Sequence, residues 1–475
     1  MRKSQLHLYT LLKTTNKTTK ISKQKQQLKQ QINILFYIFF WLLTENNFIV
    51  LVGARRGSSS SQSRALSDFN MGNNGIDSFS DQRYCFSCMS KEFEAHWSYL
   101  SNNLISEHQF GFLPKRSTTL QLLSTLQEWY NGLLDRNPTD CIYIDFRKAF
   151  DSVPHRFLLH KTTEDKIGCT PGSVIGPLLF ILFINDLPHI IKLPVQIRLY
   201  ADDVKLFLMH QSTMSCHLLQ EALDNVYKWS IDWSLPMAPD KTTFIRIGTQ
   251  KNIYPYHIEN TELIQSSSIR DLGIIIDQKL TFQEHISKIL KSAYFRSYQL
   301  LRAFKSVNPI VWAKLFKIYV LPILEYASEI WNPHLKESIN KIEKVQKFYT
   351  RIALTKCRIV SNKVSYIKRL QFFKLQQLIS RRKIIDLTTL YKICMGYSYL
   401  KPIKFLEINK RPSRKHNFLI KMPSKNSKTH NSFINRCIPD WNNLPKDAFL
   451  NNNPNSFKNW LTNFLSTFDD VLNLR

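Results

Sequence analysis

The sequence predicts an α+β fold in which short strands end in carboxylates and amphipathic helices pack behind them. Residues 197–208 alternate apolar and polar side chains around an Asp-Asp pair, which is typical of two half-buried strands joined by a tight turn. Residues 141–145 form a β-rich run that ends in a third Asp. Residues 117–134 and 219–233 instead have helical spacing of their apolar side chains.

The acidic turn contains Asp202 and Asp203. Adjacent carboxylates on a rigid hairpin repel each other and lose hydration, and a bound divalent cation such as Mg²⁺ offsets that cost. The pair alone is weak evidence, because most such pairs are solvated turns. Asp145 strengthens it, since two strands that end in acids can place Asp145 beside Asp202. Such carboxylates can hold two metal ions for phosphoryl transfer.

Apolar segments flank these acids in sequence. Between Asp145 and Asp202, Gly and Pro residues precede an apolar run at 177–184, which predicts a buried helix. Ser117 is a suitable N-cap for the helix at 117–134. Short strands are expected at 244–247 and 272–276, and a further amphipathic helix at 281–304.

Three motifs in this order carry a family resemblance. They are YIDFRKAFDSVPH at 143–155, PGSVIGPLLF at 171–180 with INDL at 184–187, and YADD at 200–203. Together they resemble the reverse transcriptase of non-LTR, LINE-type retrotransposons of the jockey/CR1 kind. Four further segments resemble the fingers motif, the closing motifs of the palm and the tail of the same reading frames: 109–118, 239–242, 269–277, and 441–445 with 456–458. The resemblance covers roughly residues 97 to 465.

The resemblance implies a right-hand polymerase palm, an antiparallel sheet with packed helices, together with partial fingers and a helical thumb and C-terminal region. The expected domains are a basic low-complexity leader with an apolar segment and a Ser-rich linker, the fingers and palm, a basic helical thumb or connection, and a C-terminal region: 1–92, 93–280, 281–400 and 401–475.

By the same resemblance, the chain is an RNA-directed DNA polymerase that acts on an RNA template, a DNA primer and deoxynucleoside triphosphates. Asp145 and Asp202 would each hold both of two Mg²⁺ ions, and Asp203 would be a supporting acid. The primer 3′-hydroxyl attacks the α-phosphate of the nucleotide, and the protein mainly positions groups and stabilises charge.

Four residues are expected to bind the nucleotide. Phe150 matches the position whose ring packs under the sugar and excludes a 2′-hydroxyl, and Gly172 belongs to the motif before the apolar helix. Lys241 matches the position of a family lysine near the nucleotide phosphates, and Arg116, just before the helix at 117–134, is expected to meet the phosphates of the incoming nucleotide. The alternatives are an ordinary core aromatic for Phe150, a solvent-facing Arg116 and a charged turn residue for Lys241.

Two departures from the family pattern put activity in doubt. Pro171 stands where the family has Gln, which removes a side-chain amide and a backbone N–H. The segment between Asp151 and Gly172 is shorter than in the family, and neither an endonuclease domain nor the first part of the fingers is found upstream. We therefore expect a truncated, internally deleted copy, and the alternative function is a catalytically silent, basic nucleic-acid-binding remnant.

Charge points to a polyanionic partner. Among 475 residues, 65 Lys and Arg face 36 Asp and Glu, a formal net charge of +29, which favours nucleic acid before acidic lipid. Residues 341–385 hold thirteen Lys and Arg and one acid, interleaved with aromatics. We expect these charges to meet phosphates and most of the aromatics to be core. A merely basic surface is the alternative, and charge alone does not exclude it.

The cysteines and the N-terminal leader indicate in which cellular compartment the protein is expected. Eight scattered cysteines form no disulfide framework, and Cys85-x-x-Cys88 has no second metal-binding pair, so a reducing, intracellular location in nucleus or cytoplasm is favoured over a zinc site. Residues 1–30 are basic, and the apolar run at 32–43 is shorter than the ~20 residues of a membrane span. Membrane association is disfavoured, although a membrane-anchored basic protein stays an alternative.

Overall fold

The computed structural model describes residues 104–147, 149, 176–210, 214–248, 254–360, 364–402, 406, 416, 418–421 and 432–472. The predicted leader at 1–92 lies outside these residues. The chain divides into two compact units. The described part of the smaller unit is 104–106, 147, 149, 176–186 and 230–236, and the other described residues form the larger unit.

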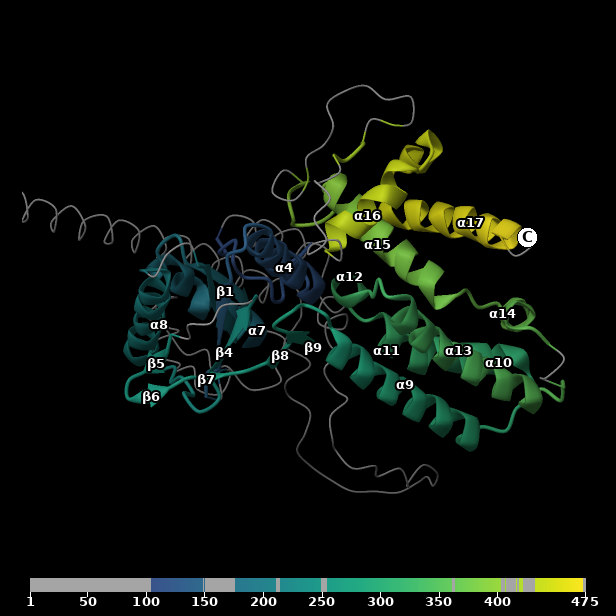
Figure 1. Ribbon diagram of the computed structural model, residues 1–475, viewed down its shortest axis with the longest axis horizontal. Helices are drawn as coiled ribbons and strands as arrows, with labels where there is room; N and C mark the ends of the chain where they lie inside the picture. The colour runs from purple at the N-terminus through teal and green to yellow at the C-terminus, as the bar shows by residue number, and fades with distance from the viewer. Residues whose placement is uncertain are drawn as a thin grey trace, which may run out of the picture. The chain divides into compact units, whose positions relative to one another are not determined.

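A five-stranded sheet organises the larger unit, with the strand order β2-β3-β1-β4-β7 (Figure 1). Its strands are β1 Thr139–Ile144, β2 Gln196–Tyr200, β3 Asp203–Met209, β4 Thr243–Ile247 and β7 Ile264–Gln265. All neighbours pair antiparallel except β4 and β7, which are parallel. The sheet is therefore mainly antiparallel with packed helices, as the sequence predicts, and the molecule is α+β.

Helix α4, Thr118–Leu134, packs on the face of the sheet that carries Cys141 and Phe207. Its Trp129 is fully buried and packs edge to face against Phe207, with 6.2 Å between the ring centroids. The helix begins as predicted, because the Ser117 hydroxyl oxygen accepts a hydrogen bond from the Leu120 N–H.

Helix α8, Met214–Asp232, corresponds to the predicted helix at 219–233 and starts five residues earlier. It buries Leu219, Leu223 and Val226. Trp229 packs against Phe146, which follows the end of β1, with ring centroids 6.4 Å apart.

Two short hairpins complete the strands of the larger unit. They are β5 His257–Ile258 with β6 Thr261–Glu262, and β8 Ser268–Asp271 with β9 Ile274–Asp277. The predicted strand at 272–276 begins only at Ile274, because Leu272 and Gly273 form the turn with positive φ angles of 44° and 89°.

The remaining regular elements described in the larger unit are helices. They are α9 Gln283–Ala303, α10 Pro309–Leu315, η3 Phe316–Val320, α11 Leu321–Glu325, α12 Ser328–Trp331, α13 Lys336–Lys356, α14 Tyr366–Phe373, α15 Leu378–Cys394, α16 Phe433–Asn442, η7 Lys446–Leu450 and α17 Pro454–Leu472. Large rings fill their core, among them Trp312, Trp331 and Trp441. Among the described residues, no helix has the length and apolar character needed to cross a membrane.

The smaller unit contains α7, Gly176–Phe183, which is the buried helix predicted from the apolar run. Ile181 and Phe183 are fully buried. The ring centroids of Phe183 and Trp233 lie 5.9 Å apart. The Asn185 side chain accepts from the Ser106 N–H at 2.8 Å and donates to the Leu104 carbonyl at 2.9 Å. The 3₁₀ segment η2, Ile184–Ile190, follows α7 and continues into the larger unit.

Candidate active site

The tip of the β2–β3 hairpin carries two of the predicted acids. Tyr200 pairs with Asp203, so Ala201 and Asp202 form a two-residue loop. Ala201 has a φ of +56° and is 4% exposed, an unusual left-handed conformation for a residue with a Cβ. The turn therefore holds Asp202 at the tip and Asp203 at the first position of β3.

Asp145 follows directly on β1, the neighbouring strand. Because Ile144 pairs with Val204 in an antiparallel register, the next position along β1 lies beside Asp203. The Asp145 carbonyl accepts a hydrogen bond from the Ala238 N–H at 2.8 Å, which fixes the backbone where the strand ends. The structure thus brings the three predicted acids together at one end of the sheet.

Bringing the three carboxylates together makes ionisation of two of them, Asp202 and Asp203, less favourable. Burial raises the pKa of the Asp202 carboxyl, and the nearby Asp145 raises it further. The pKa of Asp203 is raised to about 7. Burial is the largest cause, the negative charges of Asp202 and Asp271 add to it, and the positive charge of Lys205 opposes it. Crowded carboxylates that have lost hydration are relieved by a cation. Their oxygens are the donors that hard divalent ions prefer, so the residues present fit such an ion.

Lys241 is the predicted nucleotide-binding residue that lies at this cluster. Its Nζ is 3.8 Å from Oδ2 of Asp145, and the two side chains are 64% and 46% exposed. The turn that presents it is closed by Thr242, whose N–H and hydroxyl both donate to the Ala238 carbonyl at 2.9 Å. An exposed ammonium group at this position is available to an anionic ligand.

Arg116 makes contacts of another kind. Its guanidinium carbon lies 3.7 Å from the centroid of the Tyr399 ring, and the group donates to the Gln109 carbonyl. Burial lowers the pKa of Arg116. Its role as a phosphate ligand stays a prediction. Phe150 and Gly172 lie outside the described residues, as do Pro171 and the shortened segment at 151–172.

A buried charged group beside the acids was missed from the sequence. Lys205 on β3 and Asp271 on β8 are 2% and 4% exposed, and the ammonium donates to the carboxylate. Tyr143 on β1 donates to the same carboxylate at 2.9 Å. The alternation around the Asp-Asp pair predicted a half-buried strand at this position. That was wrong, because β3 lies inside the sheet and both of its faces are covered.

Gln109 is a second residue that sequence reasoning missed. Its Oε1 accepts from the N–H groups of Gly111 at 2.8 Å and Ala201 at 2.9 Å. The backbone beside it pairs with Leu199 of β2 through two hydrogen bonds of 2.9 Å. The motif at 109–118 carried the signal for this segment, but nothing local indicated that its Gln reaches the acidic turn.

A separate polar cluster lies at the other end of β1. Arg246 makes two hydrogen bonds of 2.6 Å to the carboxylate of Asp140, and the Tyr256 hydroxyl donates to it at 2.7 Å. His210 lies with Nε2 2.8 Å from Asp140 and Nδ1 3.4 Å from Cys216 Sγ. Because both carboxylate oxygens bind Arg246 and the two ring nitrogens face different partners, the cluster is a buried ion network and a poor metal site.

Helix α13 separates its charges from its apolar side chains. Lys341, Lys344, Lys347 and Arg351 are exposed, whereas Ile342, Val345 and Tyr349 are buried. The steps of three and four residues between them form a basic face, a name used here for those four side chains. Among the nearby aromatics, Phe373 is buried and Phe372 is 40% exposed. On α13 the four charges thus face water and Tyr349 faces the core. The prediction for 341–385 holds only in part, because Arg382 is 1% exposed and Phe372 lies at the surface.

Comparisons with known proteins agree with this geometry. The sequence profile of the family described as reverse transcriptase (RNA-dependent DNA polymerase) matches residues 78–276, which include all three acids. The chain is 26% identical over 323 residues to a probable RNA-directed DNA polymerase from transposon BS of Drosophila melanogaster, covering 58% of this chain and 36% of that protein.

Two further relatives extend the comparison. Identity is 25% over 285 residues to the RNA-directed DNA polymerase from mobile element jockey of Drosophila funebris, covering 51% of this chain and 31% of that protein. It is 35% over 141 residues to an uncharacterized protein of Caenorhabditis elegans, covering 30% of this chain and 70% of that one. The chain spans about a third of the length of the polymerases it matches.

Proposed function

We propose that this chain, which belongs to the reverse transcriptases of non-LTR retrotransposons, catalyses RNA-templated DNA synthesis at the cluster of Asp145, Asp202 and Asp203. The observation that carries the proposal is the convergence of these three carboxylates at one sheet end, where burial and mutual repulsion raise the pKa of two of them. That is the environment that divalent cations stabilise.

In this proposal Asp145 and Asp202 hold two Mg²⁺ ions, and Asp203 supports them. The ions supply the positive charge that stabilises the attacking 3′-oxygen and the leaving pyrophosphate oxygen. The turn at Ala201 and the backbone bond to Asp145 keep the carboxylates in place before substrate binds. Preorganised charge of this kind lowers the barrier because little of the protein has to move during the reaction.

The nucleotide is proposed to lie against Lys241, whose ammonium group stands 3.8 Å from Asp145 and reaches solvent. Three further contacts to the nucleotide are proposed. The sugar would meet Phe150, the base pair region would meet Gly172, and the phosphates would meet Arg116. The template and primer are proposed to run along the thumb at 281–400, where α13 presents its basic face to phosphates.

A primer-extension assay on the full chain tests the proposal, with an RNA template, a DNA primer, the four deoxynucleotides and Mg²⁺. We expect extension by the wild-type protein and a loss of about 10²-fold or more in Asp145→Asn. The matched control is Asp224→Asn, which removes an exposed carboxylate on α8 and should leave extension unchanged.

The basic face of α13 also supports a second candidate function, a silent remnant that binds nucleic acid. This function predicts no extension by either the wild type or Asp145→Asn, while binding to an RNA–DNA duplex persists and weakens steeply with salt. The sequence favours it through Pro171 and the short segment at 151–172.

A further inference from the structure

We infer that Tyr399, in the segment that follows α15, is a positioning residue that holds the acidic hairpin through Arg116 and Gln109. The inference deepens the proposed function and rests on it for its catalytic consequence. The structural part of the inference concerns the stability of the turn at Ala201, which can be measured whether or not the protein has polymerase activity.

The first link joins Gln109 to the hairpin. The Ala201 N–H, one residue before Asp202, donates to Gln109 Oε1 at 2.9 Å, and the Gln109 side chain is 2% exposed. Gly111 lies against the same turn, since a Cβ there would stand 2.7 Å from the Ala201 nitrogen. The strained left-handed turn therefore depends on a side chain that comes from a distant part of the sequence.

The second link joins Gln109 to Tyr399. The Arg116 guanidinium donates a hydrogen bond to the Gln109 carbonyl. The same group stacks over the Tyr399 ring, and the guanidinium carbon lies 3.7 Å from the ring centroid. The Tyr399 N–H donates to the Lys115 carbonyl at 3.0 Å, and its hydroxyl donates to the Glu107 carbonyl at 3.2 Å. One residue thus contacts both ends of the segment at 107–116.

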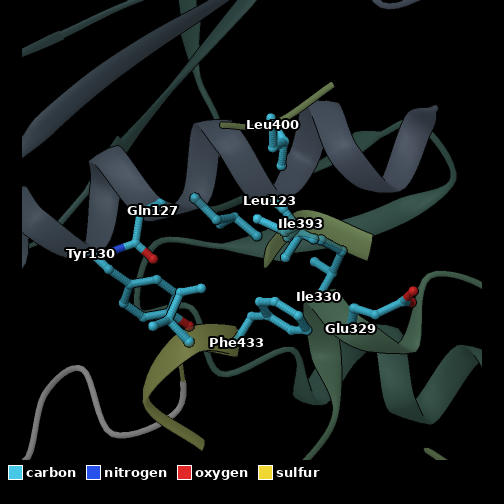
Figure 2. Close-up of a pocket in the computed structure, with 10 residues that line it drawn as sticks. Leu123, Gln127, Tyr130, Glu329, Ile330, Ile393, Leu400 and Phe433 are labelled. Carbon is cyan, nitrogen blue, oxygen red and sulfur yellow. The ribbon is translucent and has the colours of Figure 1, made fainter. Parts of the chain in front are cut away.

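The third link fixes Tyr399 itself. Its neighbour Leu400 packs over α4, where Leu123 and Tyr130 meet Ile330 of α12 and Phe433 of α16 (Figure 2). The space left between these side chains is about 10 Å³, which is at most enough for one water molecule. Close packing on this scale holds Leu400 against α4. Tyr399 itself borders a larger hollow of about 450 Å³, so its position rests on its own contacts to Glu107, Lys115 and Arg116.

Hydrogen exchange at the Ala201 amide measures the proposed coupling directly in the full chain. Gln109→Leu removes the acceptor, and Tyr399→Leu removes the ring that holds Arg116. We expect both to accelerate exchange of this amide by about tenfold, the change expected for losing one hydrogen bond. Tyr399→Phe keeps the ring and should stay within about twofold of wild type.

Tyr397→Leu is the matched control, two residues away in the same turn. Its hydroxyl bonds to the Asn452 carbonyl, and its ring stacks on Tyr391 at 6.3 Å. It should leave Ala201 exchange unchanged. If Tyr399→Leu fails to fold by circular dichroism, Arg116→Met carries the test, because it also breaks the bond to Gln109. Wild-type exchange at Ala201 in a folded Tyr399→Leu or Arg116→Met protein overturns the inference.

Steady-state kinetics test the catalytic consequence separately. We expect Tyr399→Leu to lower kcat about 10- to 100-fold while KM for the nucleotide changes less than about threefold, since a misplaced carboxylate impairs chemistry more than binding. An unchanged kcat together with faster Ala201 exchange would overturn this catalytic half. If the wild type extends no primer, the proposed function fails, and exchange still decides whether Tyr399 holds the hairpin.

Discussion

Asp203 shows how one residue can be unfavourable for stability and still suit a cation site. Burial and its acidic neighbours raise its pKa to about 7, and Lys205 only partly compensates. The folded protein therefore holds a proton on Asp203 more tightly than the unfolded chain does. A divalent cation would displace that proton and replace repulsion with attraction.

This pKa shift predicts a pH-dependent effect of Asp203→Asn on the metal-free protein. The folded pKa lies above the unfolded value of about 3.9, so the proton stabilises the fold at low pH, and this contribution is lost as pH rises through 7. Asp203→Asn should raise the free energy of unfolding by about 1 kcal/mol at pH 8.5, a figure discounted for solvent screening.

Urea unfolding in the presence of a chelator measures this effect. The stabilisation by Asp203→Asn should be smaller at pH 5 than at pH 8.5, because the native Asp203 is still protonated at the lower value. Asp224→Asn, on an exposed helix face, serves as the control with no such trend. An equal effect of Asp203→Asn at both pH values would contradict the account.

At the scale of elements, the ion pair between Lys205 on β3 and Asp271 on β8 ties the sheet to the β8–β9 hairpin. Both groups are nearly inaccessible. Removing one partner leaves a buried charge without compensation, which costs more than the pair itself contributes.

Lys205→Met should therefore lower the free energy of unfolding by about 3 kcal/mol. The double variant Lys205→Met/Asp271→Asn should recover much of the loss, because it removes the orphaned charge and keeps an acceptor for Tyr143. The control is the exposed pair of Lys192 and Glu221, 77% and 53% accessible and 2.8 Å apart, where Lys192→Met should cost less than about 1 kcal/mol. A double variant as unstable as the single one would refute this explanation.

The sequence predicted elements well where the signal is local. The hairpin, the strand before Asp145 and helix α4 with its Ser117 cap follow from alternation, helical spacing and capping chemistry. Burial of β3 on both faces did not follow, because Lys205 is neutralised by a residue 66 positions away. The contact of Gln109 with Ala201 spans 92 positions and leaves no local pattern.

At the scale of the whole molecule, a small part of the net charge of +29 lies on α13, whose basic face is exposed. Lys341, Lys344, Lys347 and Arg351 point to solvent from one side of the helix, and the opposite side belongs to the core. A regular row of cations on a rigid helix suits the regular phosphates of a duplex.

Replacing these four residues with Gln should weaken binding to an RNA–DNA duplex and flatten its salt dependence. The slope of log affinity against log salt should fall in magnitude by up to about 3.6, since each of the four phosphate contacts contributes about 0.9. Fluorescence anisotropy across a salt series measures this. The matched control neutralises four exposed lysines outside the thumb, Lys192, Lys228, Lys279 and Lys446. If both quadruple variants change the slope equally, α13 has no special role.

The central claim is that Asp145 and the acids of the hairpin share bound cations, and cleavage by Fe²⁺ tests it most directly. With added hydrogen peroxide and ascorbate, Fe²⁺ bound in place of Mg²⁺ reduces the peroxide to hydroxide and a hydroxyl radical, which cuts the backbone next to the ion, and the ascorbate restores Fe²⁺. The account predicts cuts both near Asp145 and near Asp202 and Asp203, suppressed by excess Mg²⁺ and lost in Asp145→Asn. Cuts at only one of the two segments, or cuts that persist in Asp145→Asn, would contradict it.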